Sequence, residues 1–338
     1  MSQTSPAILP SLPHPRIPAW VFNLSILLLI AALYPVKSLL ESNLDPYFYQ
    51  VLMLIGLHII LAVSLNLING ITGQFSLGHA GFLAVGAYTA GILLKHYHLP
   101  TGLTGSLLYL TTILLAGLVT AFSGLLIGIP CLRLRGDYLA IATLGFGEII
   151  NIVIVNTDSI GPFDVGGSSG LHAIPILANF FWVFAAVVIC VVSVWRIAYS
   201  SKGKAFAAIR DDEIAAAAMG VNTTYYKVAA FAIGAFFAGV AGALWATWFG
   251  DLDPSSFGFM KSFDIVVMVV LGGSGSITGS ILAATILTIL PEWLRFLSQY
   301  RLVIYSLMLI FMMLFRPQGL LGNREFFRFK KPRVASSK

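Results

Sequence analysis

The chain has 338 residues, of which 58% are hydrophobic and only 10% are charged. Because charged residues make up about a quarter of a soluble domain, this composition excludes a soluble enzyme or binding module and indicates an integral membrane protein. The net charge is +6. The basic residues lie beside apolar segments, as the positive-inside rule expects of a membrane protein, so we expect no nucleic-acid partner.

A helix needs about 20 apolar residues to cross the ~30 Å of hydrocarbon in a bilayer, and such segments follow one another along the chain. In order, we expect membrane spans at Trp20–Val36, Tyr47–Ile68, Phe75–Leu94, Leu103–Ile129, Tyr138–Asn156, Pro175–Ala198, Val228–Phe249, an interrupted region Phe263–Leu290, and Leu302–Phe315. Small residues at four-residue spacing, such as Gly234, Ala238 and Gly242, predict close helix packing. The predicted fold class is an all-α integral membrane protein, a polytopic helical bundle of about 8–10 transmembrane segments, some of them broken or re-entrant.

Lysine and arginine counts in the connections predict the orientation. The tail and the long interior loop are basic, whereas the connections that hold Asp158 and Asp251 are acidic. We therefore expect both termini in the cytoplasm, and a first span that is retained rather than cleaved as a signal peptide. The predicted division is a cytosolic segment 1–19, a first transmembrane half 20–198, a cytosolic coupling loop 199–227, a second transmembrane half 228–315 and a basic cytosolic tail 316–338.

Two glycine-rich polar stretches interrupt the apolar segments, at Asn66–Gly81 and at Gly272–Ser280. A single crossing by Phe263–Leu290 would place the basic tail outside, so we expect two short or re-entrant helices that meet beside a cavity. Glycine-broken segments in matching places of two halves indicate a transport site. The residues expected to line the path are Asn66, Asn69, Thr72, Gln74, Ser76, Ser274, Ser276 and Thr278. Both stretches contain the tripeptide Ile-Thr-Gly, at 71–73 and at 277–279. An internal repeat and coincidence explain this match equally well.

Four further polar side chains fall inside the expected spans. Glu148 lies near the middle of the fifth span, with Asn151 one turn away as a candidate partner. An ionisable group within a span is costly and marks a candidate translocation path; the alternative is that Glu148 only fixes helix packing. His79, near the start of the third span, and His58, midway along the second, either line the path or make contacts between helices.

Lys202–Lys227 is the only long polar passage in the interior of the chain. It contains Arg210, Asp211, Asp212 and Glu213, then four alanines that include Ala216, and then Gly220. Acidic residues suit a helix start, alanine suits its interior and glycine suits its end. We predict one short helix at about 211–219, suspended between two spans as a docking element for another protein. The alternative is a charged, solvated loop.

Several chemistries find no support in the sequence. No G-x-x-x-x-G-K-[ST] phosphate loop is present, so we expect no ATP hydrolysis by this chain alone. The metal motifs H-E-x-x-H and paired cysteines do not occur either. Cys131 and Cys190 are predicted to be reduced packing residues. We therefore expect no enzyme activity, no metal site and no cofactor bound by this chain.

Five stretches resemble the LivM-type permease subunits of branched-chain amino acid ABC importers. They are Gly73–Tyr88 (GQFSLGHAGFLAVGAY), Leu132–Ile150 (LRLRGDYLAIATLGFGEII), Gly203–Asn222 (GKAFAAIRDDEIAAAAMGVN), Phe263–Ser280 (FDIVVMVVLGGSGSITGS) and Phe315–Gly322 (FRPQGLLG). They follow one another in order and are spread over the chain from residue 73 to residue 322. The chain departs from the family at Ala217, where a second acidic residue is common, and in VGGSSG at Val165–Gly170, where an acidic residue commonly precedes the last glycine.

The resemblance implies a function and a set of partners. It implies a permease subunit in the inner membrane of a bacterial cell, working by alternating access with a second LivH-like permease. Two cytosolic ABC ATPases would use ATP and Mg²⁺, an external solute-binding protein would deliver and largely select the amino acid, and the predicted 211–219 helix would dock on the ATPase. The alternatives are a permease of a urea importer, an ion-coupled secondary transporter working alone, and a scaffold without transport.

Overall fold

The computed structural model describes residues 19–97, 100, 102–132, 134, 136–294, 300 and scattered positions between 304 and 320. The described residues form α1 (Ala19–Asn43), α2 (Pro46–Asn66), α3 (His79–His96), α4 (Leu103–Cys131), α5 (Asp137–Val155), α6 (Phe180–Tyr199), α7 (Ser201–Asp211), α8 (Glu213–Ala218), α9 (Thr223–Phe249), α10 (Phe259–Gly272) and α11 (Ile277–Trp293). Short pieces between them are a π-helix Leu67–Ile71, 3-10 turns Gly167–Ser169 and Pro254–Phe257, and the strands β1 (Ser159–Ile160) and β2 (Phe163–Asp164).

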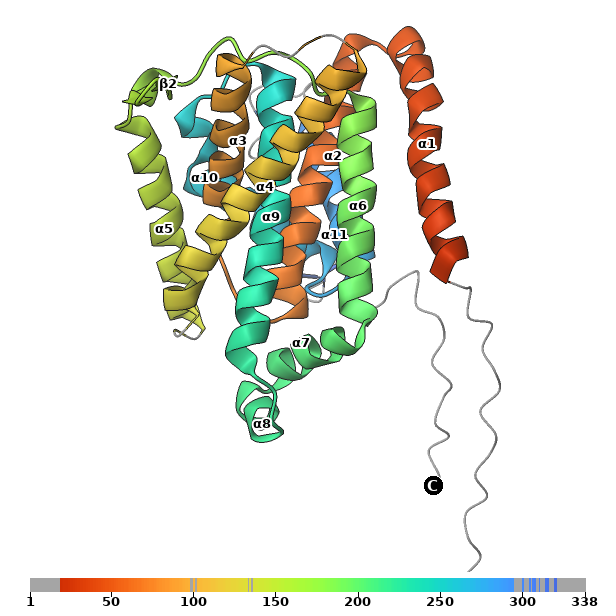
Figure 1. The fold of residues 1–338 in the computed structure, drawn as a ribbon. Helices are drawn as coiled ribbons and strands as arrows, with labels where there is room; N and C mark the ends of the chain where they lie inside the picture. The colour runs from red at the N-terminus through yellow and green to blue at the C-terminus, as the bar shows by residue number, and fades with distance from the viewer. Residues whose placement is uncertain are drawn as a thin grey trace, which may run out of the picture.

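The helices stand side by side in a single bundle, with α7 and α8 at one end and the β1–β2 hairpin at the other (Figure 1). Seven helices among the described residues are long and apolar enough to cross a membrane. The shorter helices α3 and α11 are also rich in apolar residues. The predicted fold class, a polytopic helical bundle with broken segments, is therefore confirmed.

Several helix ends differ from the predicted spans for local reasons. α3 begins at His79 rather than Phe75, because Gly73 takes a positive φ of 75° and residues 72–78 form an irregular loop. α6 begins at Phe180 rather than Pro175, where the side chain of Asn179 accepts a hydrogen bond from Trp182 N as a cap. The expected span Leu302–Phe315, the tail 316–338 and residues 1–18 lie largely outside the described residues.

α9 lies among α2, α3 and α4 and packs at backbone distance against its neighbours. A Cβ added at Gly242 would lie 2.2 Å from Leu83 O of α3, and one at Gly234 would lie 2.5 Å from the side chain of Ile68. Both glycines belong to the predicted set of small residues at four-residue spacing. Small residues let helices pack closely where lipid gives no hydrophobic drive between helices. The expectation of close packing along Gly234, Ala238 and Gly242 is confirmed, since Ala238 is fully buried as well.

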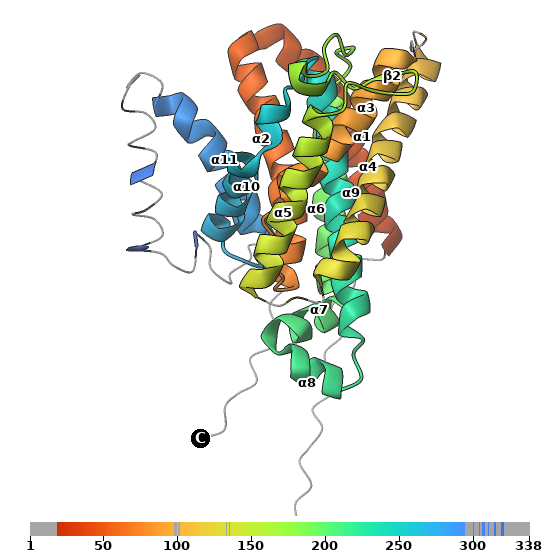
Figure 2. The ribbon, with the colours of Figure 1, turned by 90° about the vertical axis from the view of Figure 1, so that its left-hand side faces the viewer.

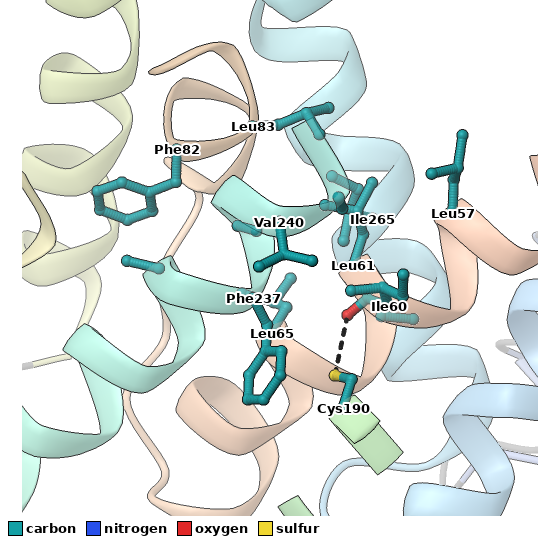
Figure 3. Packing of buried hydrophobic residues seen from close by; sticks show 14 of the residues in the cluster. Leu57, Ile60, Leu61, Leu65, Phe82, Leu83, Cys190, Phe237, Val240 and Ile265 are labelled. Carbon is teal, nitrogen blue, oxygen red and sulfur yellow. Dashed lines mark hydrogen bonds between the residues drawn. The ribbon is translucent and has the colours of Figure 1, made fainter. Parts of the chain in front are cut away.

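The core is a continuous apolar cluster between α2, α3, α9 and α10 (Figure 3). Leu57, Ile60 and Leu61 of α2 pack there with Val240 of α9. Cys190 of α6 lies at its edge, where its thiol donates to Ile60 O at 3.9 Å. Both cysteines are free and buried, as predicted.

The interrupted region folds as predicted, into two apolar helices joined by a glycine-rich turn. α10 and α11 pack against each other and against α2 (Figure 2). At the turn, Cβ atoms cannot be accommodated, because one at Gly279 would lie 2.0 Å from Gly272 O. The hairpin brings the chain back toward the same end of the bundle from which α10 started.

The close packing of α3 on α9 predicts a specific sensitivity to one methyl group. In Gly86→Ala the new Cβ would lie 2.3 Å from Gly239 O and 2.4 Å from Gly239 Cα, which are backbone atoms that cannot rotate away. We expect Gly86→Ala to lower the stability by about 1–3 kcal/mol, the usual cost of overpacking, measured as a lower Tm of the purified protein in detergent. The matched control is Gly145→Ala on α5, where nothing lies within 4 Å of the new Cβ; an equal loss of Tm in the control would contradict this account.

Candidate functional site

The first break lies between α2 and α3. α2 continues into the π-helix and then into residues 72–78, where Thr72 Oγ1 donates to Leu67 O at 2.8 Å. The side chain of Asn69 holds the two ends of this loop together. Its Oδ1 accepts from Ser76 N at 3.1 Å, and its Nδ2 donates to Ser76 O at 3.2 Å. Three of the predicted path residues thus hold the shape of the break itself.

The second break is the turn between α10 and α11. Gly273 and Gly275 both have positive φ, 103° and 92°, which only glycine adopts readily. Ser276 caps α11 by accepting from Gly279 N at 3.1 Å, and its hydroxyl lies 3.3 Å from that of Thr278. Ser274 is exposed. The predicted path residues Ser276 and Thr278 therefore start a helix.

The two breaks meet directly. Asn66 Oδ1, at the end of α2, accepts a hydrogen bond from Gly275 N at 2.8 Å. A Cβ at Gly70 would lie 2.2 Å from Gly275 N and 2.9 Å from Gly275 Cα, so the backbones touch. We call Asn66, Gly70, Gly73 and Gly275 the glycine junction. The sequence predicted both breaks, and the structure brings them together.

The two copies of Ile-Thr-Gly do not form a structural repeat. Ile71 ends the π-helix and Gly73 takes a positive φ, whereas Ile277 and Gly279 lie within the first turn of α11. The matching tripeptides therefore occupy different conformations at the two breaks.

Arg210 reaches the glycine junction from α7. Its Nη1 donates to Gly70 O at 3.4 Å, and a Cβ at Gly73 would lie 2.7 Å from Arg210 Cγ. A Cβ at Gly275 would lie 3.1 Å from the same Nη1, and Nη2 pairs with Asp211 at 3.2 Å. Arg210 was predicted to dock on a partner; its side chain is 39% exposed and also contacts both breaks.

Several polar atoms around the first break are buried without a hydrogen-bond partner among the described residues. They are Asn66 Nδ2, both amide atoms of Gln74, Ser76 Oγ and His79 Nδ1. Ser64 Oγ donates to Leu61 O, so it accepts from His79 Nε2 at 2.9 Å, which leaves His79 Nδ1 as an acceptor. Buried polar atoms are normally satisfied, and this group marks the first break as a place where water or a polar ligand can bind.

Glu148 and Asn151 lie apart from the glycine junction on α5. Both side chains are partly buried, and no hydrogen bond joins them among the described residues. Asn151 Oδ1 is buried without a partner there. α5 contacts the first break at two places. Thr143 Oγ1 accepts from Leu77 N at 3.1 Å, and a Cβ at Gly147, the neighbour of Glu148, would lie 3.3 Å from Gly78 Cα. Among the described residues, Glu148 makes no hydrogen bond to the polar group around the break.

The polar loop contains two helices where the sequence predicted one. α7, missed by the sequence analysis, begins at the cap Ser200 and buries Phe206 and Ile209. The predicted start at residue 211 was wrong, because Asp212 is extended, with φ −159°, and interrupts the helix. Its carboxylate accepts from Ile214 N and Ala215 N at 2.9 and 3.1 Å, so α8 begins at Glu213.

The predicted role of Gly220 at the end of α8 is confirmed in its local structure. Gly220 has a φ of 84° and donates to Ala217 O at 3.0 Å, while Val221 N donates to Ala216 O at 3.1 Å. These two bonds are the pattern of a Schellman cap. Ala216 is buried against the body of the protein.

The charges of the polar loop are largely used within the chain. Glu213 pairs with Lys227 of α9 at 2.6 Å, and Asp212 caps α8. What α8 presents outward is apolar: Ile214 is 69% exposed and Met219 85% exposed. This apolar surface was not predicted, because the charged residues dominate the stretch. The signal for it in the sequence is the pair of large apolar residues on either side of the alanine run.

Lys261 was also missed. The expected span began at Phe263, which placed Lys261 in a connection, whereas α10 begins at Phe259 and carries both Lys261 and Asp264.

Residues 47–315 match the family model described as the permease component of branched-chain amino acid transport systems. The high-affinity branched-chain amino acid transport system permease protein LivM of Salmonella typhimurium is 39% identical over 78% of this chain and 68% of its own length. The LivM protein of Escherichia coli is 38% identical over the same shares. The LivH permease of Salmonella typhimurium is 32% identical over 49% of this chain and 54% of its own length. No solved structure gives a significant match.

The bond between the two breaks predicts the effect of removing its acceptor. Asn66→Ala leaves Gly275 N without its acceptor in a half-buried place, which costs about 1–3 kcal/mol. We expect a lower Tm for the purified protein. Asn156→Ala is the control, because Asn156 is exposed and its amide donates to Ile152 O within its own helix. If Asn66→Ala and Asn156→Ala both have the Tm of the unchanged protein, this hydrogen bond does not contribute to stability.

Proposed function

The chain belongs to the family of permease components of branched-chain amino acid transport systems, and on that basis we propose that it is a transmembrane subunit of an ATP-driven importer of branched-chain amino acids. The observation that carries the proposal is the family match over residues 47–315. The junction of two broken helices supports it, because such breaks are where membrane transporters bind and pass their substrates. The chain is a transport subunit and not an enzyme.

The proposed assembly contains a second permease. This chain is similar both to LivM and to LivH proteins, which supports pairing between two homologous permeases around one path. Two ATPase subunits, which use ATP and Mg²⁺, and an external solute-binding protein complete the proposal. In it, the end with α7 and α8 faces the cytoplasm of a bacterial cell, as do both termini, and the β1–β2 end faces outward from the inner membrane.

The ATPase contact is proposed for α8. α8 lies at the tip of the bundle (Figure 2). Ile214 in its first turn and Met219 at its C-terminal cap are apolar and exposed. Exposed apolar side chains on a short, firmly capped helix are typical of an interface anchor. Of the two neighbouring carboxylates, Asp212 caps α8, and Glu213 attaches α8 to α9 through its ion pair with Lys227.

Arg210 is proposed to transmit the motion of α8 to the path. It stands in the last turn of α7, two residues before the cap of α8, and contacts both breaks of the glycine junction. A conformational change requires a partner that binds the two states differently. Movement of α8 in the ATPase would therefore shift Arg210 and with it the two breaks at once.

Transport by the reconstituted assembly tests the function. We expect vesicles that hold this chain with its partner permease and ATPases to take up labelled leucine when ATP and the solute-binding protein are supplied. Uptake by this chain alone under an ion gradient would instead indicate a secondary transporter, and uptake of urea without leucine would indicate the urea alternative. The relatives reported above are named for branched-chain amino acids, which favours leucine.

A charge on α8 tests the apolar anchor. We expect Ile214→Glu to prevent the ATPase subunits from copurifying with the permease, because a desolvated carboxylate costs several kcal/mol at an apolar interface. Ile176→Glu is a matched control, since Ile176 is also 69% exposed but lies in the segment between β2 and α6. Equal ATPase recovery with both variants would remove α8 as the anchor.

A substitution at Arg210 distinguishes a role in transmitting motion to the path from a role in docking the ATPase. We expect Arg210→Ala to leave the ATPases bound and hydrolysing ATP while leucine uptake falls roughly tenfold or more, because a hydrogen bond to a charged group is worth about 1.5–3 kcal/mol. Lys202→Ala, an exposed change on the same helix, serves as the control with normal uptake. Loss of the ATPases from the Arg210→Ala complex would show a docking role instead.

A further inference from the structure

A groove of about 560 Å³ lies between the start of α2 and the end of α11, two helices that stand side by side (Figure 2). Its lining is mostly apolar and includes Phe48, Val51, Leu52 and Ile55 of α2 with Ile289 and Trp293 of α11. Phe48, Ile289 and Trp293 are exposed. The groove therefore opens at the apolar surface of the bundle.

The shape of the groove matches an acyl chain. The α2 residues of the lining follow the spacing i, i+3, i+4, i+7 and form one face of the helix. At a rise of about 1.5 Å per residue, this face is about 10 Å long. α2 is one of the helices that can cross a membrane, and one leaflet of hydrocarbon is about 15 Å deep, half of the ~30 Å core. A chain lying along α2 would stay within one leaflet.

A carboxylate lies at one end of this groove. Glu292 of α11 belongs to the lining, and Tyr47 at the start of α2 donates from its hydroxyl to Glu292 Oε2. Among the described residues, Glu292 forms no ion pair and its Oε1 accepts no hydrogen bond. A carboxylate beside hydrocarbon is costly unless a positive group pairs with it. The groove thus combines apolar walls with a place for one cation.

A second carboxylate adds negative charge at this end. Leu44 lines the groove and also a neighbouring cavity of about 470 Å³, whose described lining has one charged residue, Glu41 of α1. The hydroxyl of Tyr49 accepts from Phe180 N and donates to Glu41 Oε1 at 3.2 Å, which holds the carboxylate in place. Lys37 Nζ lies 3.9 Å from the same oxygen, but an exposed pair of this kind within one helix is weak. No described lysine or arginine lines the groove or the cavity.

We propose that the groove binds a phospholipid whose headgroup carries a primary ammonium, with an acyl chain along α2 and the ammonium on Glu292. The N–H groups of the ammonium would donate to the carboxylate, and such charge-assisted hydrogen bonds are strong. A choline headgroup has no N–H to donate, and an anionic headgroup would be repelled by Glu292 and Glu41. The proposal goes beyond the proposed function and requires only that α2 and α11 lie in a membrane.

The position of the groove links this lipid to the glycine junction. α2 leads into the first break, and α11 begins directly after the second. A lipid in the groove would fill the space between the far ends of these two helices. It would therefore stabilise one arrangement of the helices that carry the two breaks.

Lipid retention tests the proposal. The chain, with the subunits that copurify with it, is placed in bilayer discs of equal parts phosphatidylethanolamine, phosphatidylcholine and phosphatidylglycerol with the same acyl chains. It is then extracted and washed in detergent, and the retained lipids are counted per chain by mass spectrometry. We expect phosphatidylethanolamine to be enriched over each of the other two at least about tenfold, the equivalent of one hydrogen bond to a charged group.

Two variants, each with a matched control, locate the binding. Glu292→Gln removes the charge and keeps the shape, and we expect the enrichment to disappear. Its control is Asp137→Asn, which removes an exposed carboxylate in the first turn of α5 and should keep the enrichment. Val51→Trp fills the groove, and we expect it to lower the retained phosphatidylethanolamine as strongly. Leu118→Trp, at an exposed position of α4, is the control for added bulk.

Equal retention of the three lipids by the unchanged chain, or full enrichment in Glu292→Gln, would overturn the proposal. Loss of the partner permease from the Val51→Trp sample would also overturn it, because the groove would then be a contact between the permeases. Leucine uptake is measured separately with the unchanged assembly, so that a failure of the proposed function is distinguished from a failure of lipid binding.

Discussion

The structure depends on one constraint, which is that backbone groups freed by breaking a helix within an apolar bundle must find partners inside the protein. The chain breaks two helices, and their freed groups find partners in the other break and in α7. Asn66 Oδ1 accepts from Gly275 N, and Gly70 O accepts from Arg210. Glycine at positions 70 and 275 permits this because a side chain would occupy the space of the facing backbone. The breaks are thus one structural unit.

The same unit joins the polar loop to the body of the protein. Arg210 lies two residues before Asp212, which interrupts the helix, and it contacts both breaks. α7, α8 and the two breaks therefore meet within a few residues of chain. Glu213 and Lys227 tie α8 to α9, which is packed at backbone distance on α3. In the proposed importer, force on the apolar tip of α8 would reach the path through these contacts and not through a flexible loop.

Features set by local signals could be predicted from the sequence. The breaks, the apolar spans and the glycine cap at residue 220 follow from composition and from the conformational freedom of glycine. Features set by distant contacts could not. Arg210 reads as one more charge in a charged cluster, and only the fold shows that its side chain meets Gly70. Lys261 was placed outside a span because helix boundaries are imprecise in sequence, and His58 and Trp245 approach it only through the packing of α2, α9 and α10.

The relative motion of the two breaks tests the central claim most directly. Spin labels at positions 75 and 274, which are both exposed, report the distance between the first and the second break in the assembled transporter. The account predicts that this distance changes when nucleotide binds, and that Arg210→Ala abolishes the change while nucleotide still binds. A nucleotide-dependent change that persists in Arg210→Ala would contradict it.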